Sequence, residues 1–207
     1  MAFDKGEPVR YISHLDLMRT WERTLRRAGL HLAHTQGFNP RPRLIFAAPL
    51  PVGITSSAEL VDVIVEDDLD AAEFRACLAP ALPPGLTVNS VEEVPLDTAP
   101  LMAMVATSDY VAELGAPITA STLQAFLVSE HVPYQRSRKG GTKQADMRPA
   151  VVDLWLADDG RKLGMRLRLD LEGLAVRPDE VLQALGLETV RVRRTALALK
   201  ERVHAAA

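Results

Sequence analysis

The clearest hydrophobic pattern in the chain lies between Ser13 and Gly29. Ser13 is a preferred N-cap, Asp16 follows it three residues later, and Gly29 suits the end of a helix. Apolar residues recur between them at the spacing of one helix face, namely Met18, Trp21, Leu25 and Ala28. The segment predicts an amphipathic helix that begins after Ser13 and ends before Gly29.

The pattern on either side of this helix predicts several strands and one further helix. LVDVIVE, at residues 60–66, is rich in β-branched residues and indicates a strand. An acidic first turn, which suits the helix dipole, introduces a second helix at 70–81. The strands of this half are expected at residues 2–4 or 9–12, 43–48, 59–66 and 86–94.

A domain boundary is expected near residues 94–102, where Pro95 and Pro100 bracket a polar stretch. After it a similar order returns, with helices expected at 121–129 and 178–185 and strands at 109–113, 134–138, 150–157, 162–170 and 189–199. Strand–helix–strand–strand–helix–strand is the ferredoxin-like, or split βαβ, arrangement. We therefore predict an α+β chain of two tandem ferredoxin-like units with antiparallel sheets, at residues 1–98 and 102–207.

Composition allows a hydrophobic core and a solvated surface, since 47% of the 207 residues are hydrophobic and 25% are charged. The net charge of −3 is unevenly spread. Residues 1–50 carry +4 and residues 132–207 carry +5, whereas residues 51–100 carry −9 and residues 101–131 carry −3. This distribution indicates a protein with two different faces rather than a general affinity for polyanions.

Neither a membrane segment nor a cofactor is expected. No apolar run reaches the ~20 residues that span a bilayer, and the first ten residues form no apolar signal segment, so a cytoplasmic protein is predicted. The single cysteine, Cys77, is expected to be a small buried residue, and one thiolate cannot hold an iron–sulfur cluster. His31 and His34 have no further ligand nearby in the sequence, and no metal-ligand spacing or dinucleotide fingerprint appears.

The loop after the first helix, TQGFNPRPR at residues 35–43, combines the features of a rigid binding element. Gly37 permits backbone conformations that are closed to other residues. Pro40 and Pro42 stiffen the chain, so that little entropy is left to lose on binding. The alternative interpretation is a rigid connector whose Phe38 packs against the protein.

The side chains of this loop have the chemistry to contact nucleic acid. Arg41 and Arg43 would project to the same side of an extended chain and could reach phosphates. Phe38 could stack on a base, and the amides of Gln36 and Asn39 could read a base edge or bind a backbone group.

A second basic segment lies between Pro133 and Pro149, with five basic residues and one acidic residue. Its paired glycines could let backbone N–H groups approach a phosphate, although the spacing of a Walker-type loop is absent. The alternative is an exposed hairpin tip. The candidate nucleic-acid contacts of this segment are Arg136, Arg138, Lys139, Gly140, Gly141, Lys143 and Arg148.

The first helix offers two weaker candidates. Its polar face carries Arg19, Arg23, Arg26 and Arg27, which form either a solvated face or a stripe that tracks phosphates. His14, in the first turn, is either a packed or capping residue or a catalytic one. General acid–base catalysis would need a partner acid or an aimed substrate, and the sequence identifies neither.

The two basic segments also resemble a known family. YISHLDLMRTWERTLRRAGL and TQGFNPRPRLIFAAPLPVG, followed by KGGTKQADMRP, RPDEVLQALGL and VRVRRTALAL, are similar to the radical SAM-associated proteins of unknown function. Members of that family occur beside a radical SAM enzyme or fused to it. The radical SAM cysteine triad is absent here, so the resemblance implies a partner chain without the enzyme.

Together these observations predict a non-catalytic RNA-binding accessory module that presents RNA to a partner enzyme, such as a radical SAM protein. The acidic stretch at residues 59–73 would face away from the RNA. Two alternatives stay open. One is a metal-independent ribonuclease or RNA-processing enzyme that uses His14, and the other is a protein-only scaffold for a radical SAM partner.

Overall fold

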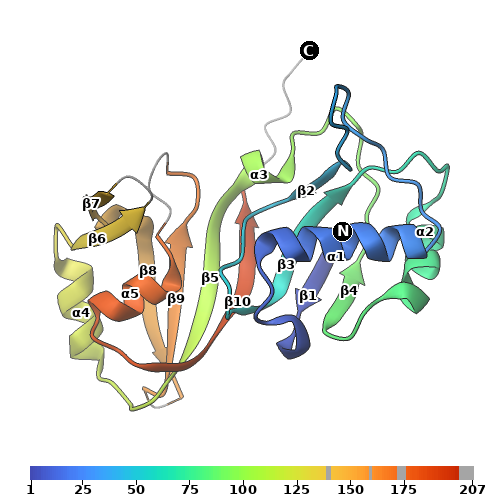
Figure 1. The fold of residues 1–207 in the computed structure, drawn as a ribbon. Helices are drawn as coiled ribbons and strands as arrows, with labels where there is room; N and C mark the ends of the chain where they lie inside the picture. Colours follow the sequence, from blue (N-terminus) through green and yellow to red (C-terminus); the bar gives the residue numbers. More distant parts are fainter. Residues whose placement is uncertain (139–140, 159, 172–175, 201–207) are drawn as a thin grey trace. The chain divides into compact units, whose positions relative to one another are not determined.

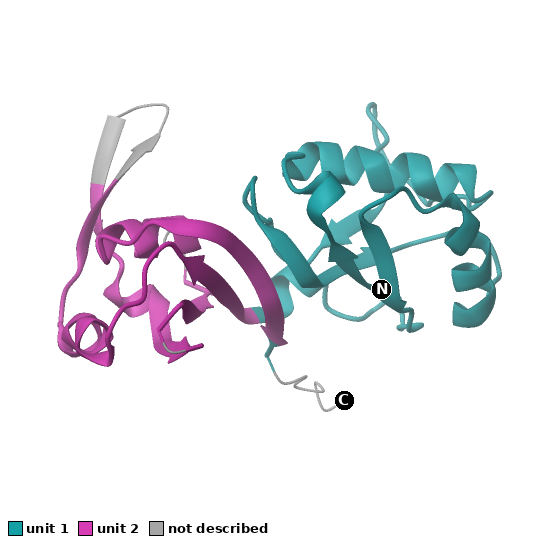
Figure 2. Cartoon of the chain, turned by 90° about the horizontal axis from the view of Figure 1, so that it is seen from below, with its two compact units in different colours: residues 1–105, 199–207 teal, residues 106–198 magenta. Residues whose placement is uncertain are grey.

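The computed structural model describes residues 1–138, 141–158, 160–171 and 176–200, without the side chains of residues 136–143. The chain divides into two compact units (Figure 2). The first comprises Met1–Val105 with Leu199 and Lys200, and the second comprises Ala106–Ala198. Together they form a mixed α+β protein whose strand pairs are mostly antiparallel.

Within its described residues, the first unit has four strands and two main helices (Figure 1). Its sheet has the order β4-β1-β3-β2, and every neighbouring pair in it is antiparallel. A short helix, α3 (Leu101–Met104), follows the sheet. The elements are, in chain order, β1 (Ala2–Lys5), α1 (His14–Arg27), β2 (Leu44–Phe46), β3 (Thr55–Val63), α2 (Ala71–Leu78) and β4 (Leu86–Ser90).

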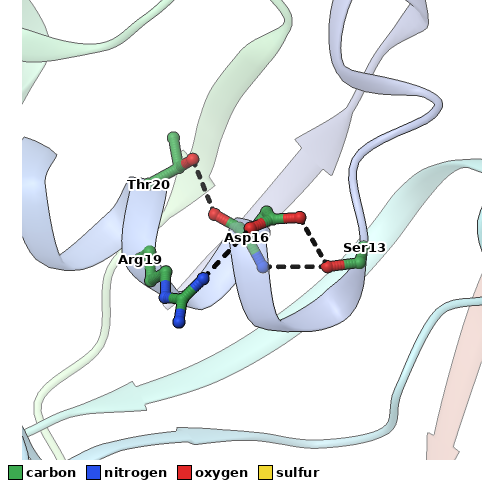
Figure 3. Close-up of polar contacts among 4 residues, drawn as sticks. All are labelled: Ser13, Asp16, Arg19 and Thr20. Carbon is green, nitrogen blue, oxygen red and sulfur yellow. Dashed lines mark hydrogen bonds and ion pairs between the residues drawn. The ribbon is translucent and has the colours of Figure 1, made fainter.

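The start of α1 confirms the predicted cap (Figure 3). The Ser13 hydroxyl oxygen accepts a hydrogen bond from the Asp16 backbone N–H at 3.2 Å and donates to the Asp16 carboxylate at 2.7 Å. The same carboxylate lies 3.5 Å from the Arg19 guanidinium. The helix ends before Gly29, as predicted, and Gly29 has a φ of +79° that favours glycine.

The core of the first unit forms between its helices and its sheet. Trp21 and Leu25 of α1 are fully buried, and the Trp21 ring meets the Phe3 ring of β1 edge-on at 4.9 Å between centroids. Phe74 and Leu78 bring α2 into the same cluster. The apolar face predicted for α1 is therefore the face that anchors it to the sheet.

The second unit repeats the sheet order of the first and adds a hairpin. Its sheet runs β10-β5-β9-β8, and a separate two-stranded sheet joins β6 to β7. Fully buried Leu163, Met165 and Leu167 contribute to its core. The elements are β5 (Val105–Leu114), α4 (Ala120–Val128), β6 (Pro133–Arg138), β7 (Gly141–Asp146), β8 (Val151–Ala157), β9 (Lys162–Arg168), α5 (Pro178–Ala184) and β10 (Thr189–Leu199).

The structure corrects some of the sequence expectations and decides between two alternatives. Cys77 is exposed, because Phe74 and Leu78 take the buried positions of α2. Of the two alternatives for the first strand, 2–4 is right, because Pro8 lies in a 3₁₀ helix, Glu7–Val9, that cannot continue a strand. The strand expected at 59–66 begins at Thr55 instead. Among the described residues, no helix combines the length and the apolar character needed to cross a membrane.

Candidate nucleic-acid interface

The first basic segment forms a projecting arm, which we define as residues 31–43, between α1 and β2. It is the blue loop that extends beyond the sheet of the first unit in Figure 1. The Ala33 backbone N–H donates to the carbonyl of Ile64, just after β3, at 2.9 Å, and the Ile64 N–H donates to the Arg43 carbonyl at 3.2 Å. The Arg43 N–H in turn donates to the Ala33 carbonyl at 2.8 Å. The root of the arm is thus fixed to the end of the sheet.

The two sides of the arm are also bonded to each other near its tip. The Thr35 backbone N–H donates to the Arg41 carbonyl at 2.8 Å, and the Arg41 N–H donates to the Thr35 hydroxyl at 3.0 Å. His34 and Pro42 form an isolated antiparallel bridge. Gly37 has a φ of +124°, which favours glycine and lets the chain reverse between these contacts. The tip is therefore a braced turn.

The arm directs its candidate contact residues to solvent. The Phe38 side chain is fully exposed, at 106% of its reference area. The alternative in which Phe38 packs against the protein is therefore wrong. The remaining predicted contacts of the arm are exposed as well, and they are Gln36, Asn39, Arg41 and Arg43.

A histidine–aspartate pair closes the base of the arm. The His31 backbone N–H and its ring Nδ1 each lie 2.7 Å from one oxygen of the Asp67 carboxylate. The side-chain hydrogen bond between them raises the pKa of His31 and lowers the pKa of Asp67. His31 and Asp67 lie far apart in the sequence, so no local motif predicts this contact.

Arg43 differs from Arg41 in its surroundings. It lines a pocket of about 490 Å³ in the first unit, next to β3, the start of α2 and the segment after β4. Acidic residues of the stretch 59–73 therefore share this pocket with Arg43, and Arg41 is the better placed cation for an external phosphate. That this stretch faces away from RNA stays a prediction. The pocket also contains six carboxylate residues, Asp62, Asp67, Asp68, Asp70, Glu92 and Glu93.

The second basic segment forms the β6–β7 hairpin. In its backbone register Arg136 pairs with Lys143, and Arg138 pairs with Gly141. The side chains of these residues, as well as all of Lys139 and Gly140, lie outside the part of the chain that the structure describes. The predicted contacts on this hairpin stay predictions.

The root of the hairpin is held by Asp146 and Arg148. The Asp146 carboxylate accepts hydrogen bonds from the backbone N–H of Val132 at 2.8 Å and of Arg148 at 2.9 Å, and it lies 2.8 Å from Nδ1 of His131. These bonds, that of His131 above all, lower the pKa of Asp146 to about 2. The Arg148 guanidinium donates to the carbonyls of Leu127 and Val151, so we assign this predicted contact residue a positioning role.

The candidates on α1 have neighbours within the first unit. The His14 ring is half-buried and meets the Phe46 ring edge-on at 5.2 Å, a contact that favours the packed interpretation. All four arginines of α1 are exposed; Arg27 donates to the Ala81 carbonyl, and Arg19 faces Asp16. Within the described ranges, no three His, Cys, Asp or Glu residues gather as they would around a metal ion.

The fold and the arm define an α+β protein of two units that exposes a braced basic arm. Its sequence matches a bacterial family over residues 1–179. The chain belongs to the family described as "Uncharacterized protein conserved in bacteria (DUF2344)". That description mentions no radical SAM enzyme, so the radical SAM association stays a prediction. No curated protein matches the sequence.

Two of the solved structures that match do so over nearly the whole of this chain. A chain in the crystal structure of a Cbf5-Nop10-Gar1 complex is 10% identical, with a TM-score of 0.50, and the match covers 97% of this chain and 50% of that one. A chain in the archaeal box H/ACA sRNP Nop10-Cbf5 complex is 14% identical, with a TM-score of 0.42, and the match covers 97% and 49%. The protein thus spans about half the length of each of these chains, and the likeness concerns the fold alone.

Proposed function

We propose that this protein is a non-catalytic RNA-binding accessory module whose contact surfaces are the arm and the β6–β7 hairpin. The observation that carries the proposal is the position of these two basic segments in the chain. The arm lies between α1 and β2, and the hairpin lies between α4 and β8. Each therefore follows the first helix of its unit and precedes the second strand of that unit's sheet.

The strand orders support this equivalence. Numbered by the order of its own sheet strands, each unit has the sheet order 4-1-3-2, because β4-β1-β3-β2 corresponds to β10-β5-β9-β8. We therefore extend the proposal to two ferredoxin-like units, each with a basic insertion at the same place. A repeated basic insertion is more readily explained by a shared polyanionic ligand than by two unrelated connectors.

The arm has the chemistry that the proposal needs. Residues 31–43 contain two arginines and no acidic residue, and Arg41 is exposed near a tip that is already braced. Arginine suits phosphate because its planar guanidinium donates several hydrogen bonds. The bound RNA would be presented to a partner enzyme, such as the radical SAM protein to which the sequence resemblance points.

The test is the salt dependence of RNA binding, measured by fluorescence anisotropy with a labelled single-stranded oligonucleotide of mixed sequence. In a plot of the logarithm of the binding constant against the logarithm of the salt concentration, each lost phosphate contact reduces the magnitude of the slope by about 0.7 for a single strand. Arg41→Ala with Arg43→Ala should weaken binding and shrink the slope by up to about 1.4, with Arg41 giving the larger part.

Arg23→Ala with Arg26→Ala is the matched control, because it removes the same charge from the exposed face of α1. It should change the slope less than the arm pair does. Equal effects of the two pairs would contradict the assigned site. Undetectable RNA binding at low salt would contradict the function and favour the protein-only scaffold. RNA cleavage by the wild type that His14→Ala abolishes would favour the ribonuclease instead.

A further inference from the structure

We infer that the tip of the arm receives an unpaired base on the Phe38 ring, so that the ligand is single-stranded or looped RNA and not a duplex. This inference rests on the proposed RNA binding and names the class of RNA that the same site takes. It starts from Phe38, which is the most exposed large apolar side chain among the described residues.

The Phe38 ring is not packed into the hydrophobic core of its unit. Its ring is fully exposed, whereas Phe3, Phe46 and Phe74 of the same unit are buried. Stacking of a solvent-exposed aromatic ring on another flat apolar surface is favourable, and every nucleic-acid base offers such a surface. The position of Phe38 therefore matches a stacking platform.

The backbone around Phe38 is organised before any ligand arrives. The mutual hydrogen bonds of Thr35 and Arg41 close the turn on either side of it, and Pro40 restricts the chain within the turn. A braced tip loses little conformational entropy on binding, so more of the stacking energy is retained as affinity.

The neighbours of Phe38 select an unpaired base. Gln36 and Asn39 flank it in the sequence and are exposed, so their amides can bond to a Watson–Crick edge, which is free only in unpaired RNA. Arg41, three residues after Phe38, supplies a cation for the adjoining phosphate. In an A-form duplex the base faces are stacked on each other, and the major groove is too deep and narrow for side chains to read.

The first experiment compares one RNA strand with its own duplex, using Phe38→Trp as a fluorescent reporter. The two native tryptophans, buried Trp21 and half-buried Trp155, supply a background that the wild type measures. Stacking should quench the additional fluorescence when the single strand binds. The duplex should bind more weakly and leave this signal largely unquenched.

The second experiment removes the ring. Phe38→Ala should weaken binding of the single strand by about 5- to 150-fold, the range expected for one stacked base. Phe38→Leu should resemble Phe38→Ala, because it retains apolar area without a flat ring. Both variants should keep the salt slope, since no phosphate contact is lost, and both should melt at the wild-type temperature, since the side chain is exposed.

The outcomes separate this inference from the proposed function. Equal affinity for strand and duplex, or normal binding by Phe38→Ala, would overturn the inference while the arginine-dependent RNA binding stands. Undetectable binding of either RNA by the wild type would overturn both.

Discussion

At the scale of single residues, Trp21 has the largest predicted effect on stability. Its ring is fully buried against Phe3, so Trp21→Ala should lower the free energy of unfolding by roughly 3–5 kcal/mol. Trp21→Phe should cost much less, because it keeps an aromatic ring and removes an indole Nε1 that has no hydrogen-bond partner among the described residues. Urea unfolding of the three proteins measures the difference, and an unchanged midpoint in Trp21→Ala would contradict the assigned core.

Residue-level prediction from the sequence succeeds where the partners are local. The Ser13 cap of α1 lies within three residues of its partner and is confirmed. Arg148 shows the opposite case, because the carbonyls to which it donates, those of Leu127 and Val151, are brought together only by the folding of the second unit. The charge of Arg148 predicts a ligand contact, whereas its hydrogen bonds indicate that it holds the root of the hairpin in place.

At the scale of elements, the sequence predicts best those whose pattern is strong and self-contained. The bounds of β10 agree with the prediction, and α1 begins where its cap indicated. The strand β7 is absent from the predicted strands, and only the alternative of an exposed hairpin tip implies it, because Gly141 and polar residues begin it and its stabilisation comes from pairing with β6. The arm was expected as a loop, whereas its hydrogen bonds to residues after β3 depend on long-range contacts.

The root of the β6–β7 hairpin should respond to acid. The pKa of Asp146 is about 2, below its ordinary value of 3.8. The ionised carboxylate therefore contributes its full stabilisation of the fold at pH values above 3.8. That contribution fades as the pH falls from 3.8 towards 2. Asp146→Ala should therefore lower the melting temperature clearly at neutral pH, and the gap to the wild type should narrow below about pH 4.

The NMR signals of two backbone amides test whether this pH dependence arises at the hairpin root. The amide protons of Val132 and Arg148, which donate to Asp146, should shift in NMR spectra as the wild type is acidified and should not titrate in the same way in Asp146→Asn. A melting-temperature gap that stays constant with pH would show that the carboxylate charge does not stabilise this root.

At the scale of the whole molecule, two units with the same order of sheet strands each contain one basic insertion. The sequence predicted the α+β class and the mostly antiparallel pairing, which the structure confirms. Sequence reasoning identified both basic segments, but their equivalent positions emerge only from the sheet orders. The arm belongs to the first unit and the hairpin belongs to the second. Contact of a single RNA with both units stays a prediction.

The most direct test of the central claim is ultraviolet crosslinking of the protein to RNA in cells, followed by mass spectrometry of the nucleotide-bearing peptides. Trypsin releases the arm within one peptide, residues 28–43, because it cuts after Arg27 and Arg43 but does not cut before Pro42. We predict nucleotide adducts on this peptide and their loss in Phe38→Ala. Adducts confined to the peptides of α1, or no crosslinked RNA at all, would contradict RNA binding through the arm.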